Sequence, residues 1–303
     1  MGISPSLLAA AEQTYASYQP DLSVPEIVYA EEVALALAMY QYEAQDEVRR
    51  IARSYASLSE YDTKEICRVA DFSSTGEFAV ILGCRVLVPG CGTGRLAYDV
   101  AVLGHDVEAN DFDIMKLAAA NAVVSRSTDD PFIIEPYCLD TCNRMKRDDH
   151  IRKVSVPDCN VDREALGRIT VNGFEFTEAY GVPAKHESFD IVLTAAFIDT
   201  APNVFAYIKT IANVLKPGAK WANTGPLGWL YDGDRFNSGR DGKFLRRLEL
   251  SHEELMEAIS AKWFDIERSE LVPGCRYCGD RRTMLETDLT FVNFVAIRNN
   301  TPG

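Results

Sequence analysis

The spacing of apolar residues along the chain changes near residue 80. Before that point, apolar side chains recur at helical intervals, as in residues 28–37 and 48–58, with charged residues between them. After it, short apolar runs alternate with longer amphipathic segments. The pattern predicts a helical N-terminal extension over residues 1–80 and a domain of alternating strands and helices over residues 81–303.

The second part of the chain divides into individual elements. Its first strand is Cys84–Val88, because this apolar run stops at Pro89-Gly90. Ser251 followed by Glu254 is a capping-box pattern, which marks the start of the last helix. The pattern predicts further strands at 105–109, 189–195, 221–224, 264–268 and 289–298, and helices at 95–103, 112–124, 202–215 and 251–262. Such alternation predicts an α/β fold with a doubly wound, mostly parallel sheet.

Two stretches interrupt the alternation, residues 131–188 and 228–248. Both are longer than ordinary connections, and long insertions in α/β enzymes usually shape the substrate side of the site. We therefore interpret both as insertions on that side.

Composition narrows the class of protein. The formal net charge of −14 is a poor match for phosphate backbones, so we expect no nucleic-acid partner. Basic runs at 144–147 and 276–282 are interpreted as solvated faces. The sequence contains no stretch of eighteen uncharged apolar residues and no signal-peptide pattern, which predicts neither a membrane nor a secretory destination. We expect a cytoplasmic protein with reduced cysteines, and a nuclear location stays open.

The first strand leads into a glycine-rich turn. Gly90, Gly92 and Gly94 directly precede the first predicted helix, where glycines allow a ligand to lie close to the backbone. The next strand ends at Asp111, about twenty residues later, where a carboxylate can accept both hydroxyls of a ribose. A dinucleotide enzyme needs a third glycine where this chain has Arg95. The shorter glycine motif, GxGxG, favours S-adenosylmethionine, a methyl donor without a pyrophosphate, over a nicotinamide cofactor.

Longer motifs point to a family. The chain resembles the carnosine N-methyltransferases in its order and spacing of VLVPGCGTGRLA (86–97), a Val156-Pro-Asp158 segment, FDIVLTAAFIDTA (189–201), LKPG (215–218) and NTGPL (223–227). This resemblance implies a Rossmann-like class I methyltransferase fold with a seven-stranded sheet. It also implies methyl transfer from S-adenosylmethionine to an imidazole nitrogen of a small molecule or peptide.

The resemblance also implies roles for single residues. It places Arg50, Arg53, Asp158 and Ala195 beside the methyl donor, although the family favours glutamine at position 50. It places Phe197, Asp199 and Tyr277 on the acceptor side. Trp229 and Tyr231, which follow the NTGPL turn, are either core aromatics or pocket walls, and we favour the pocket because the surrounding segment is interpreted as an insertion.

Asp199 is the predicted catalytic residue. A carboxylate that accepts a hydrogen bond from one ring N–H of an imidazole fixes the tautomer and stabilises the cation that forms on methylation. An alternative interpretation is that Asp199 caps the helix that begins near Ala201.

The acceptor side departs from the family. The family has a histidine shortly after its GPL motif, whereas this chain continues Gly228-Trp-Leu-Tyr231, and the tyrosine-rich segment of the last strand is missing. An acceptor that is larger, more cationic or not an imidazole at all, such as another amine, therefore stays open, as do a catalytically idle methyltransferase-like binding protein and a homodimer. Cys275 and Cys278 form a CxxC without a second pair at metal-ligand spacing, so we expect no metal.

Overall fold

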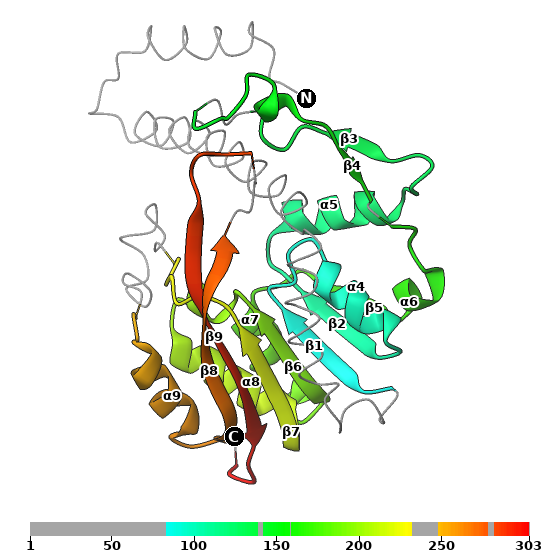
Figure 1. Cartoon of the computed structure of the whole chain (residues 1–303). Coiled ribbons are helices and arrows are strands. Elements are labelled where there is room, and N and C mark those ends of the chain that lie inside the picture. The colour runs from blue at the N-terminus through cyan, green and yellow to red at the C-terminus, as the bar shows by residue number, and fades with distance from the viewer. Residues whose placement is uncertain (1–82, 139–141, 158, 232–247, 278–281, 303) are drawn as a thin grey trace, which may run out of the picture. The chain divides into compact units, whose positions relative to one another are not determined.

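The computed structural model describes residues 83–138, 142–157, 159–231, 248–277 and 282–302. Among these residues, seven strands form one sheet in the order β5-β2-β1-β6-β7-β9-β8. Strands β1 to β7 of this sheet are parallel, whereas β9 pairs antiparallel with both β7 and β8 (Figure 1). The strands are β1 (Arg85–Pro89), β2 (Asp106–Asn110), β5 (Ile169–Asn172), β6 (Phe189–Ala195), β7 (Leu215–Thr224), β8 (Phe264–Tyr277) and β9 (Thr287–Arg298). This arrangement confirms the predicted doubly wound, mostly parallel sheet.

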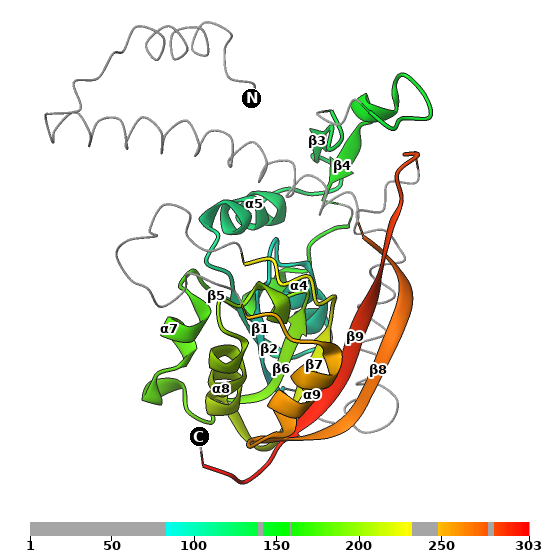
Figure 2. The same ribbon diagram turned by 90° about the vertical axis from the view of Figure 1, so that its left-hand side faces the viewer.

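Helices cover both faces of the sheet. Alternate side chains of a strand point to opposite faces, so Val86 and Val88 join one hydrophobic core while Leu87 joins the other. The first core contains residues of α4 (Arg95–Val102) and α6 (Arg163–Gly167). The second contains residues of α7 (Phe176–Tyr180), α8 (Val204–Val214) and α9 (His252–Ser260), as Figure 2 shows from the side.

Side-chain caps set the starts of α5, α8 and α9, which are three of the predicted helices. Asp113 accepts hydrogen bonds from the backbone N–H groups of residues 115 and 116 and begins α5 (Ile114–Val124). Asn203 does the same for α8, and Ser251 forms the predicted capping box with Glu254 at α9. These caps satisfy N–H groups that have no partner within the helix, which is why the predicted starts lie within two residues of the observed ones.

The interval 131–188 contains more regular structure than the sequence pattern indicated. It includes β5, which pairs in parallel with β2 and forms one edge of the sheet, and the helices α6 and α7. A separate antiparallel pair, β3 (Phe132–Ile134) and β4 (Val154–Val156), precedes them. Short 3-10 turns lie at η1 (Asp149–Ile151), η2 (Pro183–Lys185) and η3 (Ile198–Thr200). The segment that interrupts the alternation therefore ends before α6.

Two predicted strands are longer than expected. Strand β7 begins at Leu215, directly after α8, and its pairing with β6 shifts register between Leu215 and Lys220, so Lys216-Pro-Gly218 forms an irregular start of the strand. Strand β8 continues to Tyr277, where it pairs with Thr287 of β9. The last pair between β7 and β9 is Asn223 with Phe294, so the β8–β9 hairpin continues beyond the end of β7 as a two-stranded arm (Figure 1).

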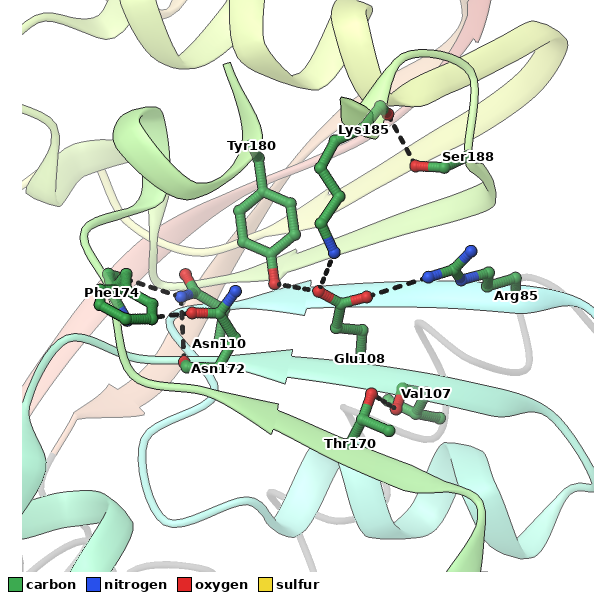
Figure 3. Close-up of polar contacts among 10 residues, drawn as sticks. All are labelled: Arg85, Val107, Glu108, Asn110, Thr170, Asn172, Phe174, Tyr180, Lys185 and Ser188. Atoms are coloured by element: carbon green, nitrogen blue, oxygen red, sulfur yellow. Dashed lines mark hydrogen bonds and ion pairs between the residues drawn. The ribbon is translucent and has the colours of Figure 1, made fainter. Parts of the chain in front are cut away.

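A buried carboxylate ties β2 to the helices on its face. Glu108 accepts hydrogen bonds from Tyr180 Oη at 2.9 Å, Lys185 Nζ at 2.6 Å and Arg85 Nη2 at 3.2 Å (Figure 3). Burial by itself raises the pKa of Glu108, but the hydrogen bonds and charges of these partners outweigh it and leave the pKa below its ordinary value. Glu108 is therefore an ionised link between the sheet and the α7–η2 segment.

Candidate functional site

The glycine-rich turn links β1 to α4. Gly90, Gly92 and Gly94 have φ angles of 65°, 56° and 84°, a region that residues with a Cβ seldom occupy. Cys91 N donates to Asn110 O at 2.9 Å, and Gly92 N donates to Asp111 Oδ2 at 2.8 Å. The turn is thereby fastened to the end of β2, at the edge of the sheet where ligands bind in α/β folds.

The glycines of this turn have different surroundings. A Cβ on Gly90 would lie 2.3 Å from Cδ2 of Phe197, so packing fills the space beside this residue. A Cβ on Gly92 would meet no atom within 4 Å, and one on Gly94 would meet only Ala120 Cβ, at 3.9 Å. The backbone at Gly92 and Gly94 therefore leaves room for a ligand to approach, whereas Gly90 allows the turn to pack against the core.

Asp111 directly follows β2 at this edge of the sheet. Its side chain is buried with 7% of the residue exposed, and its two oxygens accept from Gly92 N and from Asp113 N at 3.0 Å. A carboxylate oxygen has lone pairs for more than one donor, so these contacts leave capacity for hydroxyl groups. The geometry fits the predicted ribose contact, which stays a prediction.

The end of β5 adds residues that sequence reasoning missed. The Asn110 amide donates to Asn172 O at 3.1 Å and to Phe174 O at 2.8 Å, which joins the ends of β2 and β5 (Figure 3). Phe112 and Phe174 follow these strands and are 73% and 71% exposed, which is unusual for two aromatic rings at one sheet edge. The signal in the sequence was weak because β5 has only four residues, within a segment interpreted as an insertion.

An aromatic cluster packs against the glycine turn at Gly90. The Phe197 ring stacks on Tyr207 with centroids 4.8 Å apart and meets Phe176 edge-on at 5.2 Å. With 7% of the residue exposed, Phe197 belongs to the core between Gly90 and α8. The structure therefore shows a packing role for this ring, and its predicted contact with an acceptor stays a prediction.

Asp199 lies in the η3 turn and is 1% exposed. The alternative that it caps a helix is wrong, because Asn203 caps α8. The Asp199 Oδ2 atom accepts from Gly228 N at 2.9 Å, while Oδ1 is buried and has no hydrogen-bond partner among the described residues. Burial raises the pKa of this carboxyl, and the Gly228 N–H only partly opposes the shift. A buried carboxylate oxygen without a donor is costly, so this position is a candidate for contact with a ligand.

Two loops converge around Asp199. Ala196 N donates to Thr224 O at 2.8 Å, and Leu230 N donates to Asp199 O at 2.8 Å, so the loop after β6 pairs with the NTGPL turn after β7. Ala196 and Trp229 have φ angles of 47° and 46°, in the left-handed region that non-glycine residues rarely adopt. Such strain is concentrated at functional sites, where the surrounding contacts enforce it.

A buried polar chain fixes the ends of β6 and β7. Trp221 Nε1 donates to Thr194 Oγ1 at 2.9 Å, and Thr194 Oγ1 donates to Asn223 Oδ1 at 2.8 Å. The Asn223 amide then donates to Val292 O on β9 at 2.9 Å. Because every side chain in this series of hydrogen bonds has a partner, the loops that follow β6 and β7 leave the sheet at fixed positions.

The other predicted residues have varied positions. Ala195 is the last residue of β6, and Tyr231 is partly buried after the NTGPL turn. Trp229 is 6% exposed and donates from Nε1 to Leu250 O at 3.0 Å, so it packs in the core. Tyr277 ends β8. Arg50, Arg53, Asp158, the extension over 1–80 and residues 232–247 of the second predicted insertion lie outside the described residues.

The described residues include neither a membrane-spanning helix nor a cluster of metal-ligating side chains. No helix there is both long and apolar enough to span a bilayer. No group of three or more His, Cys, Asp or Glu side chains is arranged there to hold a metal ion.

The sheet order, the glycine turn and the acidic residue after β2 define a Rossmann-like class I methyltransferase fold. A putative sarcosine dimethylglycine methyltransferase from Galdieria sulphuraria shares this fold with a TM-score of 0.50 and 12% identity, over 78% of this chain and 86% of that one. The sequence model of the carnosine N-methyltransferase family matches residues 41–300. The chain belongs to the carnosine N-methyltransferase family.

Individual relatives agree with this assignment. The carnosine N-methyltransferase of Schizosaccharomyces pombe is 34% identical over 207 residues, which are 67% of this chain and 55% of the relative. The Dictyostelium discoideum carnosine N-methyltransferase is 33% identical over 71% of this chain and 44% of its own length. The chain thus spans about half the length of the curated relatives that it matches.

Proposed function

We propose that this chain transfers a methyl group from S-adenosylmethionine to a nitrogen of a small-molecule or peptide acceptor, with an imidazole ring as the favoured acceptor. The observation that carries the proposal is the buried Asp199 carboxylate, whose Oδ1 has no donor in the part of the chain that the structure describes, on a loop that packs against the glycine turn through Phe197. Family membership and the methyltransferase fold support the donor.

The residues at the carboxyl edge of the sheet fit S-adenosylmethionine. The open backbone at Gly92 and Gly94 would lie against it, and Asp111 would accept hydrogen bonds from its ribose. The exposed rings of Phe112 and Phe174 offer apolar surface at the same edge, as an adenine requires. Once bound, the donor supplies an electrophilic methyl carbon on a positively charged sulfur.

Asp199 favours an imidazole because of the hydrogen bond that it can accept. A neutral imidazole has one N–H donor and one nitrogen with a lone pair, so it can donate to Asp199 Oδ1 and attack the methyl carbon with the other nitrogen. An amine with a single nitrogen must use that nitrogen both to donate to Asp199 and to direct its lone pair at the methyl carbon, whereas an imidazole divides the two roles between its two nitrogens. As positive charge develops on the ring, the ionised carboxylate stabilises it.

The test is methyl transfer by the full chain from isotope-labelled S-adenosylmethionine to a panel of acceptors. The panel comprises carnosine, free histidine, histidine-containing peptides and cationic amines. Matched imidazoles that already carry a methyl on one ring nitrogen lack the N–H donor, and they should react at least about tenfold more slowly than their parents. Transfer to amines alone would overturn the imidazole assignment, and donor binding without transfer to any acceptor would favour a binding protein.

A further inference from the structure

One side chain contacts the chain on both sides of Asp199. Asp199 lies in the η3 turn, which follows Phe197 and ends at Thr200. The ring of Tyr207, in α8, stacks on Phe197 with centroids 4.8 Å apart, and the Tyr207 hydroxyl is hydrogen-bonded to the side chain of Thr200. Tyr207 therefore contacts both ends of the turn that carries the buried carboxylate.

The hydroxyl groups of Tyr207 and Thr200 form a series of hydrogen bonds. Thr200 Oγ1 donates to Phe197 O at 2.7 Å, and Thr200 N donates to the same carbonyl oxygen at 3.0 Å. Because the Thr200 hydroxyl has a single proton, which it donates to Phe197 O, its oxygen accepts from Tyr207 Oη. Burial raises the pKa of Tyr207, and the negative charges of Glu175 and Asp111 raise it further, so this hydroxyl keeps its proton and stays a donor.

Tyr207 is itself fixed by packing. The residue is 6% exposed, and its ring also meets the ring of Phe176 on α7 edge-on at 5.1 Å. The start of α8 is set by Asn203, which caps the helix three residues before the end of its first turn at Ala206. Side chains in such a close-packed interior have few alternative positions. Tyr207 is thus a rigid support for the η3 turn.

Two further hydrogen bonds of Asp199 come from the loop after β7. Gly228 N donates to Asp199 Oδ2 at 2.9 Å, and Leu230 N donates to Asp199 O at 2.8 Å. These bonds fix Asp199 relative to that loop. They do not connect it to the glycine turn between β1 and α4, where the methyl donor is proposed to bind.

Tyr207 and Phe197 supply the connection to the glycine turn. A Cβ on Gly90 would lie 2.3 Å from Cδ2 of Phe197, so the ring that stacks on Tyr207 also packs directly against this turn. Methyl transfer requires the acceptor nitrogen in line with the methyl carbon, and a misplacement of about 1 Å can lower the rate on the order of a hundredfold. A rigid connection between Asp199 and the glycine turn therefore matters more for the rate than for the binding of the donor.

We propose that Tyr207 is a positioning residue, which holds the Asp199 carboxylate at a fixed place relative to the glycine turn. Its ring acts through Phe197, and its hydroxyl acts through Thr200. The catalytic part of this inference rests on the proposed function, because it concerns the same carboxylate. The ring supplies packing and the hydroxyl supplies the hydrogen bond to the turn, so a variant that removes only the hydroxyl separates the two.

The first test measures amide hydrogen exchange in the full chain by NMR and needs no acceptor. Tyr207→Phe keeps the ring and removes the hydroxyl, so the η3 turn should open more often. The N–H groups of Gly228 and Leu230, which donate to Asp199, should exchange about fivefold faster or more, as expected for the loss of one hydrogen bond. The amides of β1 should change less than about twofold.

Tyr180→Phe is the matched control. Tyr180 is another fully buried tyrosine, on α7, and its hydroxyl donates to Glu108 at 2.9 Å. Removing this hydroxyl should lower the stability of the chain without a selective effect at Gly228 and Leu230. If Tyr207→Phe left exchange at these two amides unchanged, or accelerated it only as much as exchange in β1, the inference would be wrong.

The second test measures methyl transfer to the best imidazole acceptor. Tyr207→Phe should lower kcat about tenfold while the donor Kd changes less than about twofold, and Tyr180→Phe should leave kcat within about twofold. Thr200→Val removes the partner hydroxyl and should lower kcat in the same way, whereas Thr200→Ser keeps the hydroxyl and should behave like the wild type. The double variant Tyr207→Phe with Thr200→Val should lose little more than the weaker of the two single variants, because both remove one shared contact.

The variant Asp199→Asn separates this inference from the proposed function. A low kcat in Asp199→Asn beside a normal kcat in Tyr207→Phe would overturn the positioning role and keep the proposed function. A normal kcat in Asp199→Asn would overturn the proposed function and, with it, the catalytic role of Tyr207. Independent, additive losses in Tyr207→Phe and Thr200→Val would show that the two hydroxyls do not act together, which also contradicts the inference.

Discussion

The substitution Gly90→Ala tests how the donor turn is supported. Gly90 has a φ angle of 65°, and an added Cβ would lie 2.3 Å from Cδ2 of Phe197. The Phe197 ring has little freedom to move, because it is stacked on Tyr207 at 4.8 Å and meets Phe176 at 5.2 Å. The backbone and the aromatic cluster would have to yield together.

The expected loss of stability has two parts. A residue with a Cβ in the left-handed region costs roughly 1–2 kcal/mol more than glycine, and overpacking a filled core costs about 1–3 kcal/mol. Gly90→Ala should therefore lower the free energy of unfolding by about 2–5 kcal/mol, with a fall in Tm on the order of 5–15 °C for a domain of this size.

Gly92→Ala is the matched control. It has nearly the same backbone conformation, with φ at 56°, but its added Cβ would meet no protein atom within 4 Å. It should lose only the backbone part, roughly 1–2 kcal/mol, while its methyl group would occupy space that a bound donor needs. Gly92→Ala should thus impair S-adenosylmethionine binding more than stability, and Gly90→Ala should impair both.

The assay combines thermal unfolding in the absence of the donor with calorimetric titration of S-adenosylmethionine. Replacing Phe197 by leucine in the Gly90→Ala background should recover part of the stability, because the smaller side chain relieves the contact. The reasoning would be refuted if Gly90→Ala and Gly92→Ala had equal stability, or if the added Phe197→Leu destabilised the Gly90→Ala variant further.

Three other substitutions separate binding, catalysis and stability. Asp111→Ala should weaken donor binding by about 1.5–3 kcal/mol, and an unchanged Kd in calorimetry would remove the ribose assignment. Asp199→Asn should lower kcat roughly a hundredfold or more at nearly constant donor Kd. Since burial raises the pKa of Asp199, the activity of the wild-type chain should rise with pH through a value above the ordinary aspartate range. This rise of activity with pH should be absent in the variant. Glu108→Gln should destabilise the fold by about 1–3 kcal/mol at neutral pH. Because its partners depress the pKa of Glu108, the stability difference between wild type and variant should be largest above the ordinary glutamate pKa. It should shrink as the pH falls through the pKa of Glu108 in the folded chain. Urea unfolding at several pH values measures this difference.

The parts of the fold that could be predicted are those encoded by short sequence patterns. The run 85–89 is a buried strand because its apolar residues serve both cores, and Ser251 with Glu254 caps α9 through local hydrogen bonds. Strand β5 could not be found in this way, since its stability comes from pairing with β2, about sixty residues earlier. The β8–β9 arm likewise depends on pairing between strands and not on a local apolar run.

The site residues that are close in sequence could also be predicted better than those brought together by distant pairing. The donor turn and Asp111 are close in sequence, and a hydrogen bond from Gly92 N to Asp111 joins them in the structure. The surroundings of Asp199 were predicted less well, because the carboxylate meets Gly228, whose place is set by the pairing of two loops. The sequence left Trp229 open between a core aromatic and a pocket wall, and in the structure its indole donates to Leu250 O within the core.

The segment after the GPL motif, where the family has a histidine, contains Gly228 beside Asp199 in this chain. A Cβ on Gly228 would lie 3.2 Å from Asp199 Oδ2, so the small residue lets the carboxylate approach the backbone N–H closely. The indole of Trp229 donates to Leu250 O. If the proposed function holds, Asp199 Oδ1, which has no hydrogen-bond partner among the described residues, would be the contact that selects the acceptor. A single buried acceptor atom discriminates strongly for an N–H donor and weakly for the size of the molecule that carries it. The site should thus be strict about acceptor chemistry and permissive about what is attached to the reacting ring.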